Sequence, residues 1–199
     1  MESALRTLVE LDHALFFTLN GAHCKFLDPI MKFLSNIYVW IPMYLILLGC
    51  LFYVFPRKKA LFALLAVLLT FLVTDRLSAS LLKEGVQRLR PSHMPGWEGT
   101  FRLLEGKGGL YSFVSSHAAN VFGLATVTGR LFRRKRYSFF IFLWATLVSY
   151  SRIYVGKHFP LDVVCGALLG LITGLLVFWL YKWVIKKSEQ HAMHRRLHH

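Results

Sequence analysis

Residues of the types that carry catalysis gather in three short stretches of the sequence. They are Lys83, Arg88 and Arg90 in the first, Ser115, Ser116 and His117 in the second, and Ser151, Arg152, His158 and Asp162 in the third. Each stretch lies at the end of an apolar segment, where a charged side chain costs a few kcal/mol to insert into a membrane. Snorkelling explains lysine and arginine there, but not two histidines, paired serines and an aspartate. The pattern therefore predicts one polar functional site.

The cationic members of this set indicate an anionic ligand. Lys83, Arg90 and Arg152 offer fixed positive charge and many hydrogen-bond donors, which suit the oxygens of a phosphate that gains charge in its transition state. His158 and Asp162 are four residues apart, so they share one face if a helix starts just after the histidine. A carboxylate in that position fixes the imidazole tautomer and stabilises the cation that forms.

The composition is typical of an integral membrane protein. Of the 199 residues, 55% are hydrophobic, and the mean hydropathy is positive. Spanning the hydrocarbon core as a helix takes about 20 mostly apolar residues. Five windows approach or reach that length: 37–55, 60–82, 114–128, 137–154 and 161–185. The third window is the shortest and most polar, so we expect its outer end to line a wet site.

The remaining segments complete the expected fold. Leucine and phenylalanine recur at helical spacing before residue 20, which predicts an amphipathic helix in the membrane interface, with a sixth span as the alternative. Residues 1–36 form this interfacial segment, and residues 83–112 form a largely irregular connection. We therefore expect an all-α, polytopic membrane helix bundle of five to six spans in one domain, residues 1–199, with a basic cytoplasmic tail at 188–199.

The distribution of charge gives an orientation. The chain carries a formal net charge of +14, and 13 of its 24 lysines and arginines fall on one side of the predicted spans. They are Arg57, Lys58, Lys59, Arg130, Arg133, Arg134, Lys135, Arg136, Lys182, Lys186, Lys187, Arg195 and Arg196. Cytoplasmic loops of membrane proteins carry such an excess. Membrane topology thus explains the positive net charge without a nucleic-acid partner. The polar site is expected on the other side, at the periplasmic or outer face of the inner membrane.

Three sequence motifs resemble those of a known family. Residues 83–91 read KEGVQRLRP, residues 115–120 read SSHAAN, and residues 151–162 read SRIYVGKHFPLD. They are similar to the three motifs of the type 2 phosphatidic acid phosphatases, a superfamily shared with the vanadium haloperoxidases. The resemblance covers roughly residues 61–177. The second motif departs from its common form, because Val114 and Ser116 stand where proline and glycine are usual, and a positive φ at Ser116 would be strained.

The resemblance implies a role for each motif residue. His158 would attack phosphorus to form a phosphohistidine, Asp162 would orient it, and His117 would protonate the leaving oxygen. The phosphate oxygens would be held by Lys83, Arg90, Arg152, Ser115 and the backbone amide near Ser116. The family uses no metal and no other cofactor.

A membrane lipid phosphate is the implied substrate. Undecaprenyl diphosphate is the first expectation, and lipid A phosphate and phosphatidylglycerol phosphate are the alternatives, because the motifs define the phosphate chemistry and not the lipid. A vanadate-dependent haloperoxidase would use the same anion site, but its relatives are soluble. A non-catalytic membrane scaffold or transporter explains the spans but not the histidines and serines.

Overall fold

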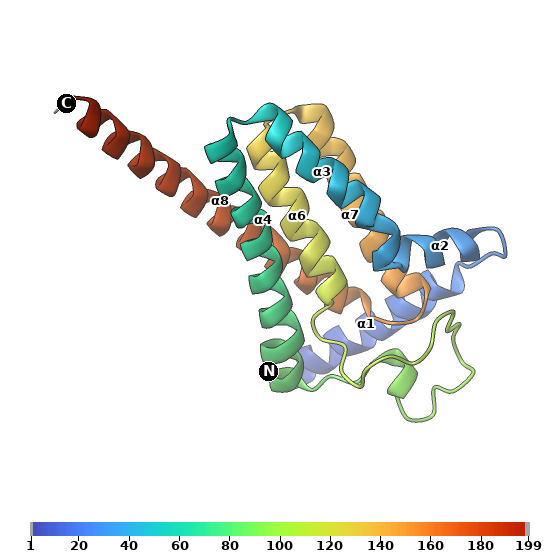
Figure 1. Cartoon of the computed structure of the whole chain (residues 1–199). Coiled ribbons are helices and arrows are strands. Elements are labelled where there is room, and N and C mark those ends of the chain that lie inside the picture. Colours follow the sequence, from blue (N-terminus) through green and yellow to red (C-terminus); the bar gives the residue numbers. More distant parts are fainter. Residues whose placement is uncertain (1, 198–199) are drawn as a thin grey trace.

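A computed structural model describes residues 2–197, whose long helices pack into a bundle that the C-terminal half of the last helix leaves (Figure 1). The helices are α1 (Glu2–Gly21), α2 (Leu27–Ser35), α3 (Ile41–Val54), α4 (Arg57–Asp75), α5 (Lys83–Val86), α6 (Ser116–Phe132), α7 (Lys135–Tyr154) and α8 (Pro160–Leu197), with the short segments η1 (Ile37–Trp40), η2 (Arg76–Leu82) and η3 (Pro91–His93). The predicted all-α membrane fold is confirmed.

The centre of the bundle is α6, which packs against α4, α7 and α8. Glycines at every fourth position of α8 allow it to approach α6 closely. A Cβ atom added to Gly166 would lie 2.5 Å from the carbonyl oxygen of Ser115, and one added to Gly174 would lie 2.7 Å from Cβ of Thr126. This close packing fixes the start of α6 beside the start of α8, where two of the three motifs lie.

Three of the described helical segments are long and apolar enough to cross a membrane: Ile37–Val54, Arg57–Val86 and Pro160–His191. The second runs from α4 through the π-helical segment η2 into α5. Two further predicted windows correspond to α6 and α7, which lie alongside these segments in the bundle (Figure 1). Because α6 is shielded by its neighbours, it needs fewer apolar residues than a lipid-facing span. The total of five spans stays a prediction.

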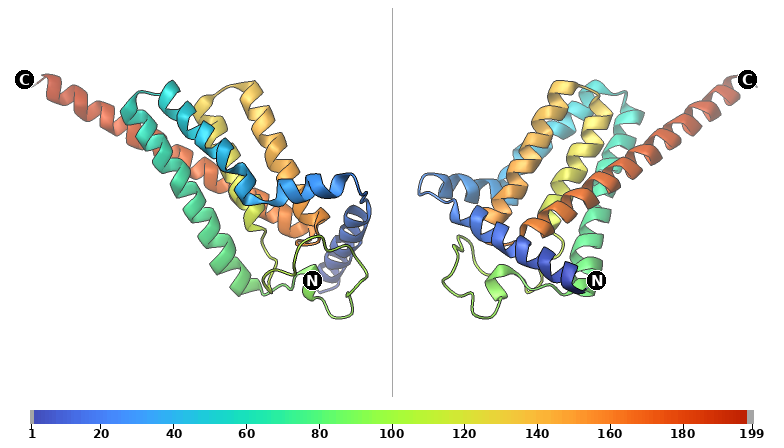
Figure 2. Two further views of the ribbon diagram at one scale, coloured as in Figure 1. Left: turned by 45° about the vertical axis from the view of Figure 1, so that its right-hand side comes forward. Right: turned by 180° about the vertical axis from the view of Figure 1, so that it is seen from behind.

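The amphipathic helix expected before residue 20 is α1, which lies across one end of the bundle (Figure 2). Leu5, Leu8 and Leu11 are at least 60% exposed, whereas Asp12 and Phe16 are buried. This helix is not apolar enough to count among the membrane-capable segments of the described chain. The interfacial position of α1 stays a prediction.

The two ends of the bundle differ in character. The α3–α4 and α6–α7 connections lie at one end, and the C-terminal half of α8 leaves the bundle on the same side (Figure 1). This end carries the basic residues that the sequence places together. Residues 188–197 of the predicted tail continue α8 as a helix, and residues 198–199 lie outside the described range. The motif residues lie at the opposite end.

Candidate active site

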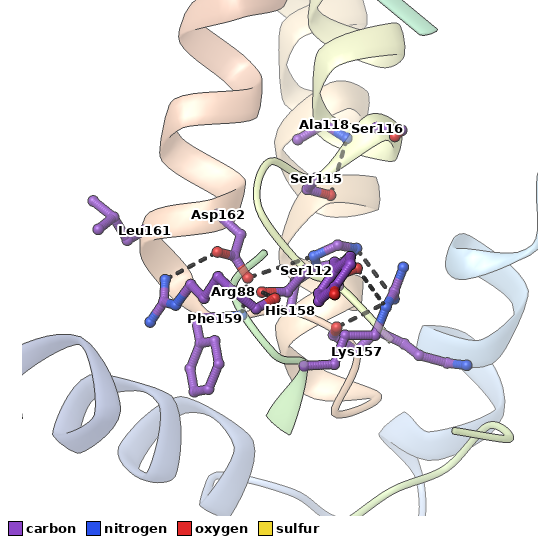
Figure 3. A network of polar contacts seen from close by, with 12 residues as sticks. Arg88, Ser112, Ser115, Ser116, Ala118, Lys157, His158, Phe159, Leu161 and Asp162 are labelled. Atoms are coloured by element: carbon purple, nitrogen blue, oxygen red, sulfur yellow. Dashed lines mark hydrogen bonds and ion pairs between the residues drawn. The ribbon is translucent and has the colours of Figure 1, made fainter. Parts of the chain in front are cut away.

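The presumed nucleophile of the third motif, His158, is buried in the turn between α7 and α8, with 2% of its surface exposed. Its Nε2 atom lies 3.5 Å from Nη1 of Arg90, and its Nδ1 atom lies 3.6 Å from Oδ2 of Asp162 (Figure 3). Burial, reinforced by the positive charges of Arg90 and Arg152, holds the pKa of the imidazole well below its ordinary value of 6.5. The ring is therefore neutral at physiological pH and can act as a nucleophile.

Asp162 is fixed in the first turn of α8 by four contacts. Its Oδ2 atom accepts a hydrogen bond from the backbone N–H of Phe159 at 2.9 Å, and its Oδ1 atom accepts one from Nη1 of Arg88 at 2.9 Å. Its carbonyl oxygen accepts from the N–H of Ser115 at 3.0 Å. The same Oδ2 atom lies near Nδ1 of the neutral His158, at a distance too long for a close hydrogen bond. The predicted neighbours thus lie together, although His158 lies in the turn before α8 and not on the helix itself.

The structure adds Arg88 and Asp12 to the site. Arg88 lies over the ring of Phe159, 4.1 Å from its centroid, and donates to Asp12 of α1 at 2.5 Å as well as to Asp162. Asp12 also accepts from the N–H of Leu161 at 2.8 Å. The sequence places Arg88 in the polar cluster without a role, and it gives no reason to connect Asp12 with that cluster. Their contact makes α1 part of the support of the site.

The first cation, Lys83, begins α5 and donates to the hydroxyl of Ser116 at 3.1 Å. The same hydroxyl accepts from Ser78 of η2 at 2.9 Å. A glycine, the usual residue at this position of the motif, could hold neither group. Ser116 is the first residue of α6 and does not belong to the positive-φ residues of the described chain. The expectation of backbone strain at this residue is therefore wrong. The serine instead positions the lysine.

The two arginines of the motifs converge from different elements. Arg90 donates from Nε to the carbonyl oxygen of Tyr111 at 3.1 Å and from Nη1 to that of Lys157 at 3.3 Å. Arg152, 5% exposed at the end of α7, contacts the hydroxyl of Ser35 and lies 3.5 Å from Oε2 of Glu105. Its Nε donor is buried without a partner among the described residues. Such a donor is available to an anion.

The N-terminus of α6 completes the anion-binding side. Ser115 is its N-cap, with a side-chain oxygen that accepts from the N–H of Ala118 at 3.4 Å. Free N–H groups and the helix dipole make such a terminus favourable for a phosphate oxygen. The predicted phosphate ligands Lys83, Arg90, Arg152, Ser115 and Ser116 all belong to this end of the bundle.

The second histidine, His117, lies within electrostatic range of His158, Arg152 and Lys83. It also lines a cavity of about 310 Å³ whose other walls include Tyr44 and Phe71. An imidazole on the apolar side of a cationic site can protonate a group that leaves into that cavity. The two histidines therefore share one site. Among the described residues, no group of three or more histidine, cysteine, aspartate or glutamate side chains could hold a metal ion.

This set of a buried neutral imidazole, converging cations and a second imidazole defines a phosphate ester hydrolase embedded in a membrane bundle. Residues 59–186 match the PAP2 superfamily, and the chain belongs to that family. The resemblance read from the three motifs is thus confirmed.

The chain is similar to two sequence relatives and to two solved structures. The chain is 41% identical over 175 residues to the lipid A 4'-phosphatase of Porphyromonas gingivalis, covering 87% of this chain and 74% of the relative. It is 36% identical over 180 residues to an undecaprenyl-diphosphatase of Sulfolobus acidocaldarius, covering 88% and 82%. The crystal structure of Aquifex aeolicus LpxE superposes with a TM-score of 0.64 at 30% identity, covering 84% of this chain and 94% of that one. A phosphatidylglycerolphosphate phosphatase from Bacillus subtilis, at 24% identity, shares the fold with a TM-score of 0.69 over 91% and 87%.

Proposed function

We propose that the protein hydrolyses a phosphate monoester on the sugar head group of lipid A, at the 4' position. The observation that carries this proposal is the chemistry of the cavity beside His117, where Asp75 and Asn120 share the wall with aromatic residues. Lipid A 4'-phosphatases of two organisms, 41% and 38% identical to the chain, support it. Undecaprenyl diphosphate, the first expectation from the sequence, becomes the second candidate.

The proposed reaction has two displacements. Nε2 of neutral His158 attacks phosphorus, the bond from phosphorus to the leaving oxygen breaks, and His117 gives that oxygen a proton. Water then attacks the phosphohistidine, His117 takes a proton from it, and the phosphorus–nitrogen bond breaks to release phosphate. Lys83, Arg90 and Arg152 stabilise the charge that develops on the phosphate oxygens in both steps.

Arg88 and Asp162 act through His158. The carboxylate of Asp162 lies beside Nδ1, where it favours the cation that forms as Nε2 attacks. Arg88 holds that carboxylate and links it to Asp12 of α1. We infer that these residues position the nucleophile and do not contact the substrate.

The leaving-group side favours a sugar over a second phosphate. In a diphosphate lipid, the group that leaves is itself an anionic phosphate, which the carboxylate of Asp75 would repel. The leaving group of a sugar phosphate is an alcohol, and the neighbouring hydroxyl and amide groups of a sugar can donate to that carboxylate. Aromatic and aliphatic residues of the same cavity, Trp40 and Phe71 among them, suit an adjoining acyl chain.

The test of this proposal is a panel of substrates offered to the purified protein in detergent. We expect kcat/KM for phosphate release to be highest with lipid A bisphosphate, and mass spectrometry of the product should find the 4' phosphate missing. A higher kcat/KM with undecaprenyl diphosphate or phosphatidylglycerol phosphate would transfer the assignment to that lipid. A product that has lost only its 1-phosphate would contradict the proposed cleavage at the 4' position.

Replacement of Asp75 by asparagine should change the preference between the two substrate types. At an effective dielectric near 20, removing one carboxylate charge about 12 Å from the leaving phosphate relieves a repulsion on the order of 1.4 kcal/mol, which corresponds to about tenfold in kcat/KM. The ratio of undecaprenyl diphosphate to lipid A turnover should rise by about that factor. Glu84→Gln removes a carboxylate from an exposed position outside the cavity and should leave the ratio unchanged. An unchanged ratio in Asp75→Asn would remove the basis for the sugar preference.

We further propose that the active end faces the periplasm and that the chain resides in the inner membrane. The opposite end carries the basic connections between α3 and α4 and between α6 and α7, an excess typical of the cytoplasmic side. Lipid A phosphates presented in the outer leaflet would then reach the site from within the membrane. A cysteine introduced at the exposed Glu98, in the loop beside the active end, should react with a membrane-impermeant thiol reagent in the periplasm when Cys24, Cys50 and Cys165 have been replaced by serine.

A further inference from the structure

A second hollow lies at the end of the bundle opposite the active site, between α6, α7 and α8. It has a volume of about 640 Å³ and opens along the side of the bundle. α7 ends and α8 begins at the turn that holds His158, and the two helices diverge from this turn, while α8 stays against α6 (Figure 2). We call this hollow the basal groove. It shares no lining residue with the cavity beside His117.

One part of the wall of the basal groove is apolar. Phe142 of α7 faces Leu171, Leu175 and Phe178 of α8 across it. These positions lie within predicted membrane segments, so the groove is open to lipid chains and not to bulk water. An acyl chain that lies in it exchanges contacts with mobile lipid for contacts with a fixed protein wall.

The mouth of the basal groove is cationic. Arg130 and Arg133 at the end of α6 and Lys182 of α8 belong to its lining, which contains no acidic residue. Among the side chains that the structure describes, none of the three has a carboxylate within salt-bridge distance, although Lys182 lies 5.8 Å from the centroid of Trp179. The general excess of basic residues on this side of the bundle explains why these three residues are cationic. It does not explain why all three line one hollow that also has an apolar wall.

We propose that the basal groove binds an anionic phospholipid of the leaflet opposite the active site. Its phosphate would lie between Arg130, Arg133 and Lys182, held by charge-assisted hydrogen bonds, and an acyl chain would follow Leu175 and Phe178 of α8. A zwitterionic lipid brings an ammonium group to the same cations and is disfavoured. The proposal is independent of the substrate of the phosphatase, because the two sites lie at opposite ends.

The test is native mass spectrometry of delipidated protein in detergent, titrated with dioleoyl phosphatidylglycerol and with dioleoyl phosphatidylcholine. We expect one phosphatidylglycerol to bind at least about tenfold more tightly than phosphatidylcholine. Arg130→Gln combined with Lys182→Gln should weaken that binding about tenfold or more. Arg134→Gln combined with Lys186→Gln removes the same charge from exposed positions outside the groove and should change it less than twofold. An equal loss of phosphatidylglycerol affinity in both double variants, or equal affinity of the wild-type protein for both lipids, would overturn the proposal.

A steric pair of variants tests the groove itself. Leu175→Trp places a large side chain in the groove and should abolish the bound phosphatidylglycerol, whereas Leu176→Trp adds the same group on the outer face, where Leu176 is 65% exposed. Both variants should retain wild-type phosphatase activity, so failure here is distinguishable from failure of the proposed function. Retention of the lipid by Leu175→Trp, or a dimer that excludes the lipid from the wild-type protein, would contradict the proposal.

Discussion

Alanine at position 158 should reduce phosphate release from lipid substrates by a factor on the order of 10⁴ or more, because the change removes the imidazole nitrogen that lies 3.5 Å from Nη1 of Arg90. The cations would still bind the phosphate, so KM should change much less than kcat. Steady-state phosphate release with lipid A bisphosphate measures both. Brief incubation with labelled substrate should trap an acid-labile phosphoenzyme in the wild-type protein and none in the variant.

Folding must be separated from chemistry in this experiment, since His158 is buried at the turn between α7 and α8. Thermal unfolding in detergent, followed for the alanine variant and for His158→Gln, reports whether the bundle survives. His23→Ala makes the same chemical change at an exposed position and should leave turnover intact. A folded His158→Ala protein that keeps a hundredth or more of the wild-type kcat would rule out the phosphohistidine.

The sequence predicts which residues form the site better than it predicts the contacts that hold those residues in place. The spacing of His158 and Asp162 requires only that a helix begin after the histidine, and Pro160 begins α8 as that reasoning needs. Lipid surrounds most of the bundle, and a charged side chain that faces lipid costs free energy. The charged residues at the helix ends are therefore expected to face one another in a common polar site. Local spacing and the cost of burying charge thus predict which residues meet.

The supporting contacts could not be predicted from the same reasoning. Arg88 and Asp12 are 76 positions apart. Helical spacing places Asp12 on the face of Leu8, Phe16 and Leu19 and Glu10 on the opposite face, which agrees with the burial of Asp12 and the exposure of Glu10. The spacing does not say which residue Asp12 meets, because that depends on how α1 crosses the bundle, and aromatic packing of Phe16 against Phe159 and Trp97 sets this crossing.

Ser116 illustrates a departure from the family pattern whose effect the sequence misjudges. The expectation of backbone strain assumes that the position needs the freedom of glycine. In this chain the residue starts α6 with ordinary helical geometry, and its hydroxyl meets Lys83 and Ser78. The contact depends on η2, where the π-helical turn carries Ser78, and a one-turn irregularity of this kind has no periodic signal in the sequence.

Asparagine at position 117 should affect lipid and activated substrates very differently. A sugar or lipid alcohol leaves as an alkoxide unless it is protonated, so loss of the general acid should lower kcat for lipid A bisphosphate by roughly 10² to 10⁴. Nitrophenolate leaves from p-nitrophenyl phosphate without a proton, so the first displacement should stay within about tenfold of wild type. Hydrolysis of the phosphohistidine should still be slow, because His117 also activates water.

The expected signature is therefore a burst. Stopped-flow absorbance should detect about one nitrophenolate per site released rapidly by His117→Asn, followed by a slow steady state in which the phosphoenzyme accumulates. His23→Asn, the same change at an exposed residue, should give wild-type kinetics with both substrates. If the burst in His117→Asn is slowed as much as lipid turnover, His117 acts before proton transfer, through substrate binding or the placement of His158, and the cavity beside it loses its assignment as the leaving-group side.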